Sequence, residues 1–249
     1  MALADVARSQ ALAMAAAIRE CPPTAASYQL EDCHLLSPAY TGSGFTRKVL
    51  SKFVHLPVSR HSTTLQTVRQ QNLSASCFIM TLRDPLERIE SGVRYRIMTN
   101  ATWNSTSTDI ASSRNVYKYA RQLPTADLLV AAWQDSQHPL HAKVPQLALS
   151  SNPPRMQADM IRGHACGSTA LRVLCTSSLE EELSRLAAEF GRQLPIKTNA
   201  PRPRSPDANV HSLALRRWFS CHSVAAEDTW LHYEMCTRAG GARPPCTSG

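Results

Sequence analysis

The segment SCFIMTL, at residues 76–82, constrains the fold more than any other part of the sequence. A short run that is rich in large apolar residues predicts a strand of a sheet. Arg83, Asp84 and Pro85 follow it at once. Aspartate is a favoured N-cap and proline a favoured first residue of a helix. The sequence therefore predicts a strand, a tight turn and a helix in direct succession.

A second segment has the same order, with a glycine loop between its strand and its helix. The run CHLLSPAY at residues 33–40 predicts a buried strand, and TGSG follows it. From Thr46 onward, apolar residues recur at helical spacing, at Val49, Leu50, Phe53 and Val54. A strand, a glycine loop and a helix in this order direct backbone N–H groups and a helix N-terminus toward an anion.

A third unit lies near the C-terminus. ALRVLCT at residues 170–176 predicts a strand, and residues 177–191 predict a helix that Ser178 caps and Gly191 ends. Parallel strands that each lead into a helix predict an α/β fold, a central parallel sheet flanked by helices. Ligands of such sheets bind at the carboxyl ends of the strands. Further helices are predicted at residues 3–20, 86–98, 126–134, 210–221 and 224–236.

The domain limits follow from breaks in these patterns. The proline pair at 22–23 ends the first helix, so we expect residues 1–32 to form an N-terminal helical extension. Residues 238–249 are expected to form a tail. Residues 33–237 remain for one domain, and a hydrophobic content of 43% is enough for a buried core.

Cysteines and glycosylation motifs favour an oxidising compartment. The chain has eight cysteines, an even number that allows up to four disulfides, and the sequence does not give their pairing. Asn72, Asn100 and Asn104 each begin an Asn-X-Ser/Thr sequon. No CxxC, HxxxH or HExxH pattern is present, so we expect no metal site. No apolar stretch is long enough to span a bilayer, and membrane contact is expected only through an anchor absent from this chain.

The net charge of +8 suits an anionic partner. A nucleotide, an acidic polysaccharide, a nucleic acid or a membrane surface would each fit, and so would a purely solubilising role. Basic and aromatic residues are not interleaved, so nucleic acid ranks last among these partners and we expect none.

The glycine loop, in the stretch AYTGSGFTRKVLSKF at residues 39–53, differs from a nucleotide-triphosphate loop. A Walker A loop carries Lys-Ser/Thr after its last glycine, whereas Phe45 and Thr46 follow Gly44 here. Gly42 and Gly44 let the backbone approach a ligand closely, and the Ser43 and Thr46 hydroxyls can bind a phosphate without a metal. An ordinary strand-to-helix turn is the alternative interpretation.

The arginine after the second strand is a candidate anion ligand. Arg83 can form forked hydrogen bonds to phosphate oxygens, and Ser91 lies about two helical turns later. In the alternative interpretation, Arg83 pairs with Asp84 or Glu87 and Ser91 packs in the interior.

These two motifs, in this order, resemble those of the sulfotransferases that use 3′-phosphoadenosine 5′-phosphosulfate (PAPS). YTGSGFTRKVL resembles the family's 5′-phosphosulfate loop loosely, and FIMTLRDPLERIESGVRY resembles its 3′-phosphate motif closely. LRVLCTSSLEEELSRLAAEFG is similar to the family's late strand and helix, and VAAEDTWLHYEMC to the closing helix of Golgi-type members. The resemblance covers residues 33–237 and implies a P-loop-like α/β domain.

The resemblance implies roles for individual residues. Ser43, Gly44, Phe45 and Thr46 would hold the 5′-phosphosulfate, while Arg83 and Ser91 would bind the 3′-phosphate. Gly42 stands where many members carry a lysine that neutralises the phosphate leaving group, although some members have P-G-S-G there. Either Arg47 or Lys48 would supply the missing charge, or both are solvated helix residues.

The acceptor hydroxyl needs a general base, which Golgi-type members place between the two motifs. SRHSTTL at residues 59–65 resembles the histidine-bearing segment of several carbohydrate sulfotransferases, so His61 is preferred over His55. A histidine with an ordinary pKa can accept a proton near neutral pH. A structural histidine is the alternative at both positions.

The expected function is sulfuryl transfer from PAPS, without a metal, to a hydroxyl acceptor that is a glycan or another molecule. The expected location is the Golgi lumen, with a membrane anchor in the full-length protein, or outside the cell. The first alternative is a catalytically inactive sulfotransferase-like protein that binds glycans, which Gly42 favours. A P-loop NTPase is a further alternative, and the missing Lys-Ser/Thr argues against it.

Overall fold

The computed structural model describes residues 3–20, 28–38, 41–52, 57, 64–70, 77–88, 91, 122–144, 157–164, 169–193, 217, 220–221, 226–237 and 244. Its strands are β1 (Cys33–Leu36), β2 (Cys77–Leu82) and β3 (Ala170–Cys175). Its α-helices are α1 (Leu3–Glu20), α2 (Ser43–Leu50), α3 (Leu65–Gln70), α6 (Ala126–Gln134), α8 (Gln157–Ile161), α9 (Leu179–Glu189) and α11 (Ala226–His232). Short 3-10 turns are η1 (Leu30–Asp32), η2 (His141–Lys143) and η3 (Thr176–Ser178), and η5 (Tyr233–Thr237) is a π-helical turn.

The sheet is parallel and has the strand order β1-β2-β3. Cys33 pairs with Cys77 in register, and Cys77 with Ala170. Every residue of the central strand β2 is buried, which explains why its sequence is apolar throughout rather than alternating. The predicted α/β class, with a central parallel sheet and helices around it, is confirmed. The first strand is shorter than predicted, because it ends at Leu36 and not at residue 40.

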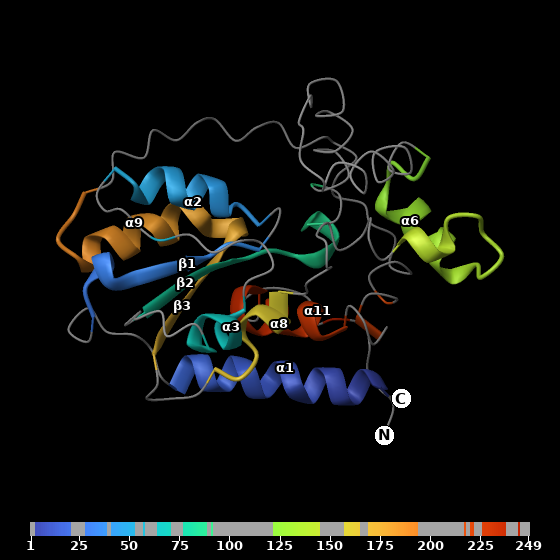
Figure 1. Cartoon of the computed structure of the whole chain (residues 1–249), viewed down its shortest axis with the longest axis horizontal. Coiled ribbons are helices and arrows are strands. Elements are labelled where there is room, and N and C mark those ends of the chain that lie inside the picture. Colours follow the sequence, from blue (N-terminus) through green and yellow to red (C-terminus); the bar gives the residue numbers. More distant parts are fainter. Residues whose placement is uncertain are drawn as a thin grey trace.

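Helices cover both faces of the sheet (Figure 1). α2 and α9 lie on one face, while α1, α3, α8 and α11 lie on the other. Successive side chains of a strand point to opposite faces. Accordingly, Phe78, Met80 and Leu82 pack in the core beneath α1 and α11, whereas Ile79 packs in the core beneath α2 and α9. The sheet therefore separates two distinct hydrophobic cores.

α1 packs into the same core as the sheet. The predicted helix at 3–20 is confirmed. The guanidinium carbon of Arg8, in its second turn, lies 4.8 Å from the centre of the Trp230 ring of α11. Alanines add little bulk, so a helix that carries them on one face can lie close to its neighbour. The buried face of α1 consists of Ala7, Ala11, Ala15 and Ile18.

The ends of the other helices agree with the sequence in part. α6 spans the predicted residues 126–134, and Thr125 caps it by accepting from the Leu128 N–H. Gly191 has a φ of 67° just beyond α9, as expected for a glycine that ends a helix. Ser178 stands at the N-cap of α9, but the prediction that its side chain caps the helix is wrong. Its hydroxyl instead donates to the Glu182 carboxylate at 2.9 Å. The same carboxylate accepts from the Cys175 N–H at 2.6 Å, and this second bond holds Glu182 beside Ser178.

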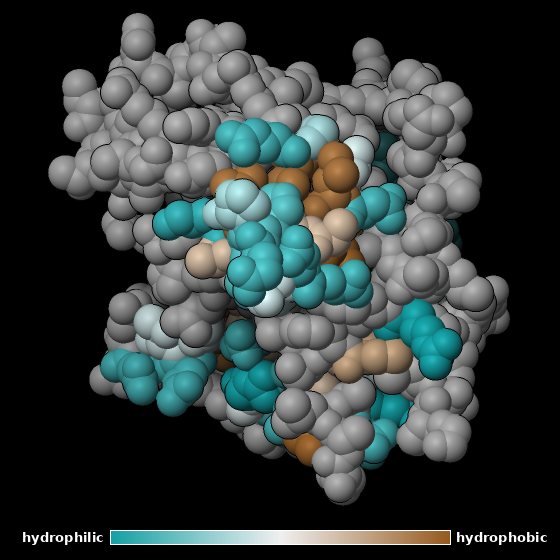
Figure 2. Space-filling model, turned by 90° about the vertical axis from the view of Figure 1, so that its right-hand side faces the viewer, coloured by the Kyte–Doolittle hydropathy of each residue, from teal (hydrophilic) through white to brown (hydrophobic). Residues whose placement is uncertain are grey.

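Two disulfides tie the sheet together. Cys33–Cys77 joins β1 to β2, and Cys175–Cys236 joins the end of β3 to η5. The prediction of disulfide bonds is therefore confirmed for these four cysteines. None of the helices in the described ranges is long and apolar enough to cross a membrane. Figure 2 shows the end of the molecule that carries α6, where apolar and hydrophilic side chains lie mixed on the surface.

Candidate functional site

Two turns that the sequence analysis singled out lie at the carboxyl edge of the sheet. We call residues 41–46 the glycine turn and residues 83–88 the arginine turn. Thr41 and Thr81 are hydrogen-bonded through their hydroxyls at 2.8 Å, and both are fully buried. This bond fixes the start of the glycine turn against β2, just before Arg83. Two segments that are far apart in the sequence therefore meet at one edge, where ligands of parallel sheets bind.

The conformation at position 42 requires glycine. Gly42 has a φ of 79°, in the left-handed region that side chains other than glycine rarely adopt. A Cβ atom there would also lie 3.1 Å from Leu179 Cδ2, at the start of α9, and 3.6 Å from Thr176 Cγ2, in η3. Glycine at this position therefore fits both the backbone conformation and the close approach of the turn to the start of α9.

The threonine hydroxyls of the glycine turn are bonded to the turn itself and to the residues beside it. Thr46 is fully buried, its N–H donates to the Gly42 carbonyl at 3.0 Å, and its hydroxyl donates to the same oxygen at 3.3 Å. Thr41 donates to the Pro38 carbonyl at 2.8 Å. Thr46 thus stabilises the first turn of α2 and does not present its hydroxyl to solvent. Phe45 is half-buried and packs against the core beneath α2 and α9.

The remaining part of the glycine turn is open. Ser43 begins α2, and Gly44 is exposed with no heavy atom within 4 Å of the position of a Cβ. The first N–H groups of a helix have no acceptor within the helix, so the backbone of residues 43–45 offers donors at this edge. Arg47 and Lys48, on the next turn, are exposed. A cationic helix surface therefore follows the glycine turn directly.

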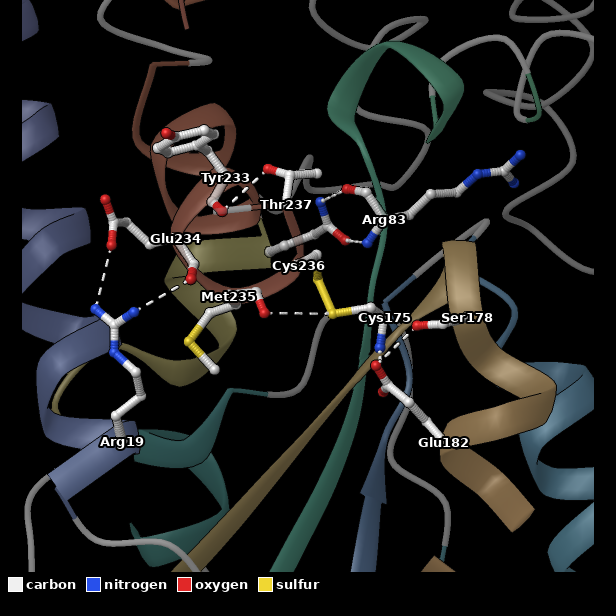
Figure 3. Close-up of a disulfide and its surroundings, with 11 residues drawn as sticks. Arg19, Arg83, Cys175, Ser178, Glu182, Tyr233, Glu234, Met235, Cys236 and Thr237 are labelled. Atoms are coloured by element: carbon white, nitrogen blue, oxygen red, sulfur yellow. Dashed lines mark hydrogen bonds and ion pairs between the residues drawn. A yellow bond between two sulfur atoms is a disulfide. The ribbon is translucent and has the colours of Figure 1, made fainter. Parts of the chain in front are cut away.

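The arginine turn is formed as the sequence predicts. The Asp84 carboxylate accepts from the Leu86 N–H at 2.9 Å and from the Glu87 N–H at 3.2 Å, and so caps the helix that begins at Pro85. Arg83 Nε lies 3.5 Å from Glu87 Oε2, one of the two ion pairs that the sequence left open. The Arg83 side chain is 27% exposed. In Figure 3 it extends away from the labelled residues of η5 and the disulfide.

The backbone of Arg83 is held by a residue that the sequence analysis missed. The side-chain amide of Gln157, at the start of α8, accepts from Arg83 N–H at 2.9 Å and donates to Arg83 C=O at 2.8 Å. Gln157 is fully buried. Its amide thus pairs with the chain where β2 has ended, as a neighbouring strand would. No local pattern around residue 157 in the sequence indicates this contact.

Asp228 of α11 completes this arrangement. Its carboxylate accepts from the Gln157 N–H at 3.0 Å and from the Ala158 N–H at 2.8 Å, and it lies 3.8 Å from the Arg88 guanidinium. Burial raises the pKa of Asp228 above its ordinary value, while the charge of Arg88 and these N–H donors act in the opposite direction. Asp228 therefore links the arginine turn, α8 and α11 in the interior.

His232 lies one helical turn after Asp228 and is buried, with an exposed fraction of 7%. Burial lowers its pKa below the ordinary value of 6.5, and the carboxylates of Asp84, Glu87 and Asp228 oppose this shift. A histidine in this environment is neutral at neutral pH. His232 lies outside the segment between the two motifs, where the resemblance places a catalytic histidine, so no sequence pattern indicated it.

Three expected site residues are described only in part or not at all. Ser91 is helical and half-buried, and the residues next to it lie outside the described part of the chain. His61 and His55, the candidate bases, are also outside the described residues. Within the part that is described, no group of three or more histidine, cysteine, aspartate or glutamate side chains could hold a metal ion.

Comparison with known proteins gives no match. No protein-family model matches the chain, and no curated protein and no solved structure is significantly similar to it.

Proposed function

We propose that the chain is a PAPS-dependent sulfotransferase whose domain is P-loop-like, acting on a hydroxyl group that a carbohydrate provides. The observation that carries the proposal is the hydrogen bond between Thr41 and Thr81, which brings the glycine turn to the end of the strand that leads into Arg83. The sequence resemblance assigns a different phosphate of one nucleotide to each of these turns. One nucleotide can contact both only if they share an edge of the sheet.

In the proposed complex the two turns have different tasks. The backbone N–H groups of residues 43–45 face the 5′-phosphosulfate, and the partly exposed Arg83 guanidinium binds the 3′-phosphate together with Ser91. When the nucleotide binds, Arg83 leaves its ion pair with Glu87 and pairs with the 3′-phosphate. The ion pair with Glu87 lies at the surface, where such pairs are weak. Arg47 adds positive charge beside the 5′ end.

The reaction that follows is an in-line transfer. The acceptor oxygen attacks the sulfur of PAPS, the bond between that sulfur and the bridging phosphate oxygen breaks, and adenosine 3′,5′-bisphosphate leaves. His61 takes the proton of the acceptor hydroxyl in this proposal. Positioning and stabilisation of the leaving phosphate supply most of the rate enhancement, as in phosphoryl transfer.

Calorimetric titration with adenosine 3′,5′-bisphosphate tests the proposal. Arg83→Ala is expected to weaken binding by about 10–100-fold, because a hydrogen-bonded charge contributes about 1.5–3 kcal/mol. Adenosine 5′-phosphate, which lacks the 3′-phosphate, is expected to bind wild type and Arg83→Ala equally. A wild-type protein that does not bind the bisphosphate would refute the proposal.

Two variants serve as matched controls. Arg185 forms an ion pair with Glu181 one helical turn away, at 3.2 Å, as Arg83 does with Glu87. Arg185→Ala removes the same charge from α9 and is expected to leave the affinity unchanged. Glu87→Gln removes the competitor of the phosphate, and we expect it to bind the bisphosphate at least as tightly as wild type.

A second candidate function is a sulfotransferase-like protein that binds glycans without turnover. The closed conformation at Gly42 and the buried Thr46 favour it, because neither position offers a side chain to the leaving phosphate. Transfer of labelled sulfate from PAPS to a panel of glycans, abolished in His61→Ala, would exclude this function. Binding of the bisphosphate without any transfer would favour it.

A further inference from the structure

A buried polar network fixes the backbone of Arg83 from two distant segments of the chain. The Gln157 amide forms two hydrogen bonds with the backbone of Arg83, and the residues are 74 positions apart in the sequence. These bonds determine the direction in which the chain leaves β2. They therefore also determine where the Arg83 side chain starts.

Asp228 in turn fixes Gln157. One carboxylate oxygen of Asp228 accepts from the backbone N–H of Gln157 at 3.0 Å and lies 3.4 Å from its side-chain nitrogen, while the other accepts from Ala158 N–H at 2.8 Å. The carboxylate thus holds the first turn of α8, a helix of five residues. Without these bonds, little in so short a helix would keep the Gln157 side chain in place.

The polar character of this network calls for an explanation beyond packing. Gln157 and Asp228 are both fully or almost fully buried, and an apolar residue of similar size would fill position 157 without desolvating an amide. The three hydrogen bonds of the Gln157 side chain described above go to the Arg83 backbone and to Asp228. Fully satisfied polar networks of this kind impose one specific geometry on the groups they connect.

We propose that Gln157 and Asp228 are positioning residues for Arg83: they hold its backbone so that the guanidinium meets the 3′-phosphate of the nucleotide. Neither residue contacts the ligand in this proposal. The inference rests on the proposed function for the identity of the ligand, whereas the support of the Arg83 backbone does not depend on it.

Gln157→Leu tests the inference, since leucine is similar in size and removes both bonds to Arg83. We expect affinity for adenosine 3′,5′-bisphosphate to fall about tenfold, because small displacements of a binding group have large effects. Affinity for adenosine 5′-phosphate is expected to stay unchanged. In the Arg83→Ala background, Gln157→Leu is expected to cause no further loss. Equal losses for both nucleotides, or additive effects of the two substitutions, would overturn the inference.

Hydrogen exchange supplies a readout that needs no ligand. The amide of Arg83 is expected to exchange faster in Gln157→Leu and in Asp228→Asn, a variant of unchanged size. Asp159→Asn, on the exposed side of the same helix, is the control and is expected to change neither exchange nor affinity. Unchanged exchange at Arg83 in folded Gln157→Leu would refute the positioning role. If the wild-type protein does not bind the bisphosphate, the proposed function is refuted. The hydrogen-exchange result then still decides whether Gln157 supports the backbone of Arg83.

Discussion

The glycine turn and the arginine turn lie at one edge of the sheet, but the range of the contacts that stabilise them differs. The glycine turn is closed mainly by bonds to nearby residues, since Thr46 bonds to the Gly42 carbonyl and Thr41 to the Pro38 carbonyl, while the Thr41–Thr81 bond joins it to β2. The arginine turn depends on Gln157, 74 positions later, and this residue depends on Asp228, a further 71 positions along. A locally closed turn offers mainly its backbone to a ligand, whereas a turn held from elsewhere can direct a charged side chain.

The two helical layers show the same difference. The core beneath α2 and α9 is built almost entirely from apolar side chains and the Cys33–Cys77 pair. On the opposite face of the sheet, Arg88, Gln157, Asp228 and His232 are buried beside the apolar core. Stability of the glycine turn should therefore respond to shape, and stability of the arginine turn to charge and pH.

The largest effect is expected from breaking the support of the arginine turn. Asp228→Ala removes the ion pair between Asp228 and the buried Arg88 and the acceptor of three N–H donors, so we expect a loss of about 3–5 kcal/mol in the free energy of unfolding. Asp159→Ala, which removes an exposed carboxylate from α8, is expected to cost less than about 1 kcal/mol. Denaturant titration measures both. A small effect of Asp228→Ala would mean that the contacts of Asp228 in α11 do not stabilise the arginine turn.

A smaller loss is expected in the glycine turn, and it tests shape alone. Gly42→Ala places a Cβ at a positive φ and close to Leu179, so we expect a destabilisation of about 1–2 kcal/mol. Gly44→Ala meets open space within α2 and is expected to be neutral or to stabilise by up to about 1 kcal/mol. Thermal unfolding of the pair decides the matter. Equal melting temperatures would show that position 42 tolerates a side chain.

The bond that joins the glycine turn to β2 is expected to contribute about 1 kcal/mol. Thr41→Val and Thr81→Val keep the shape of each residue and remove its hydroxyl, so a double-mutant cycle isolates the hydrogen bond between them. We expect coupling of about 1 kcal/mol in the free energy of unfolding. Additive losses would mean that the turns are held in place independently.

The smallest expected effect is a change in the pH dependence of stability. Because burial lowers the pKa of His232 from 6.5, the unfolded chain binds a proton more readily there than the folded one. The free energy of unfolding that neutral His232 contributes is fully present above pH 6.5, and it is lost as the pH falls from 6.5 toward the lowered pKa of the folded state. His232→Gln is expected to flatten this slope, measured by urea titration at several pH values. An unchanged slope in His232→Gln would contradict the assignment.

Local patterns in the sequence predicted much of the fold and little of the support of the site. The apolar run at 77–82 and the helix signals around residues 84–85 need no information from elsewhere in the chain, and both are confirmed. The pairing of Cys33 with Cys77 depends on the strand register, which the sequence does not give. The contacts of Gln157 exist only once α8 and α11 have packed beside β2, and therefore no spacing indicates them.

The expectation for Ser178 failed for a related reason. The sequence correctly placed a capping residue, Ser178, at the start of α9. In the structure the Cys175 N–H at the end of β3 holds the Glu182 carboxylate close to Ser178, so the Ser178 hydroxyl donates to Glu182. Local propensity determines which residue stands at the N-cap. Tertiary contacts then determine the partner to which its side chain bonds.

The Cys175–Cys236 crosslink has a practical consequence for anyone who purifies this protein. It closes a loop of 61 positions and thereby contributes about 4 kcal/mol on a chain-entropy estimate. The crosslink is adjacent to the helix that carries Asp228 (Figure 3). Expression in a reducing bacterial cytosol, or storage with dithiothreitol, would remove this covalent link, and α11 would then depend on its packing in the core and on noncovalent contacts such as the hydrogen bonds of Asp228.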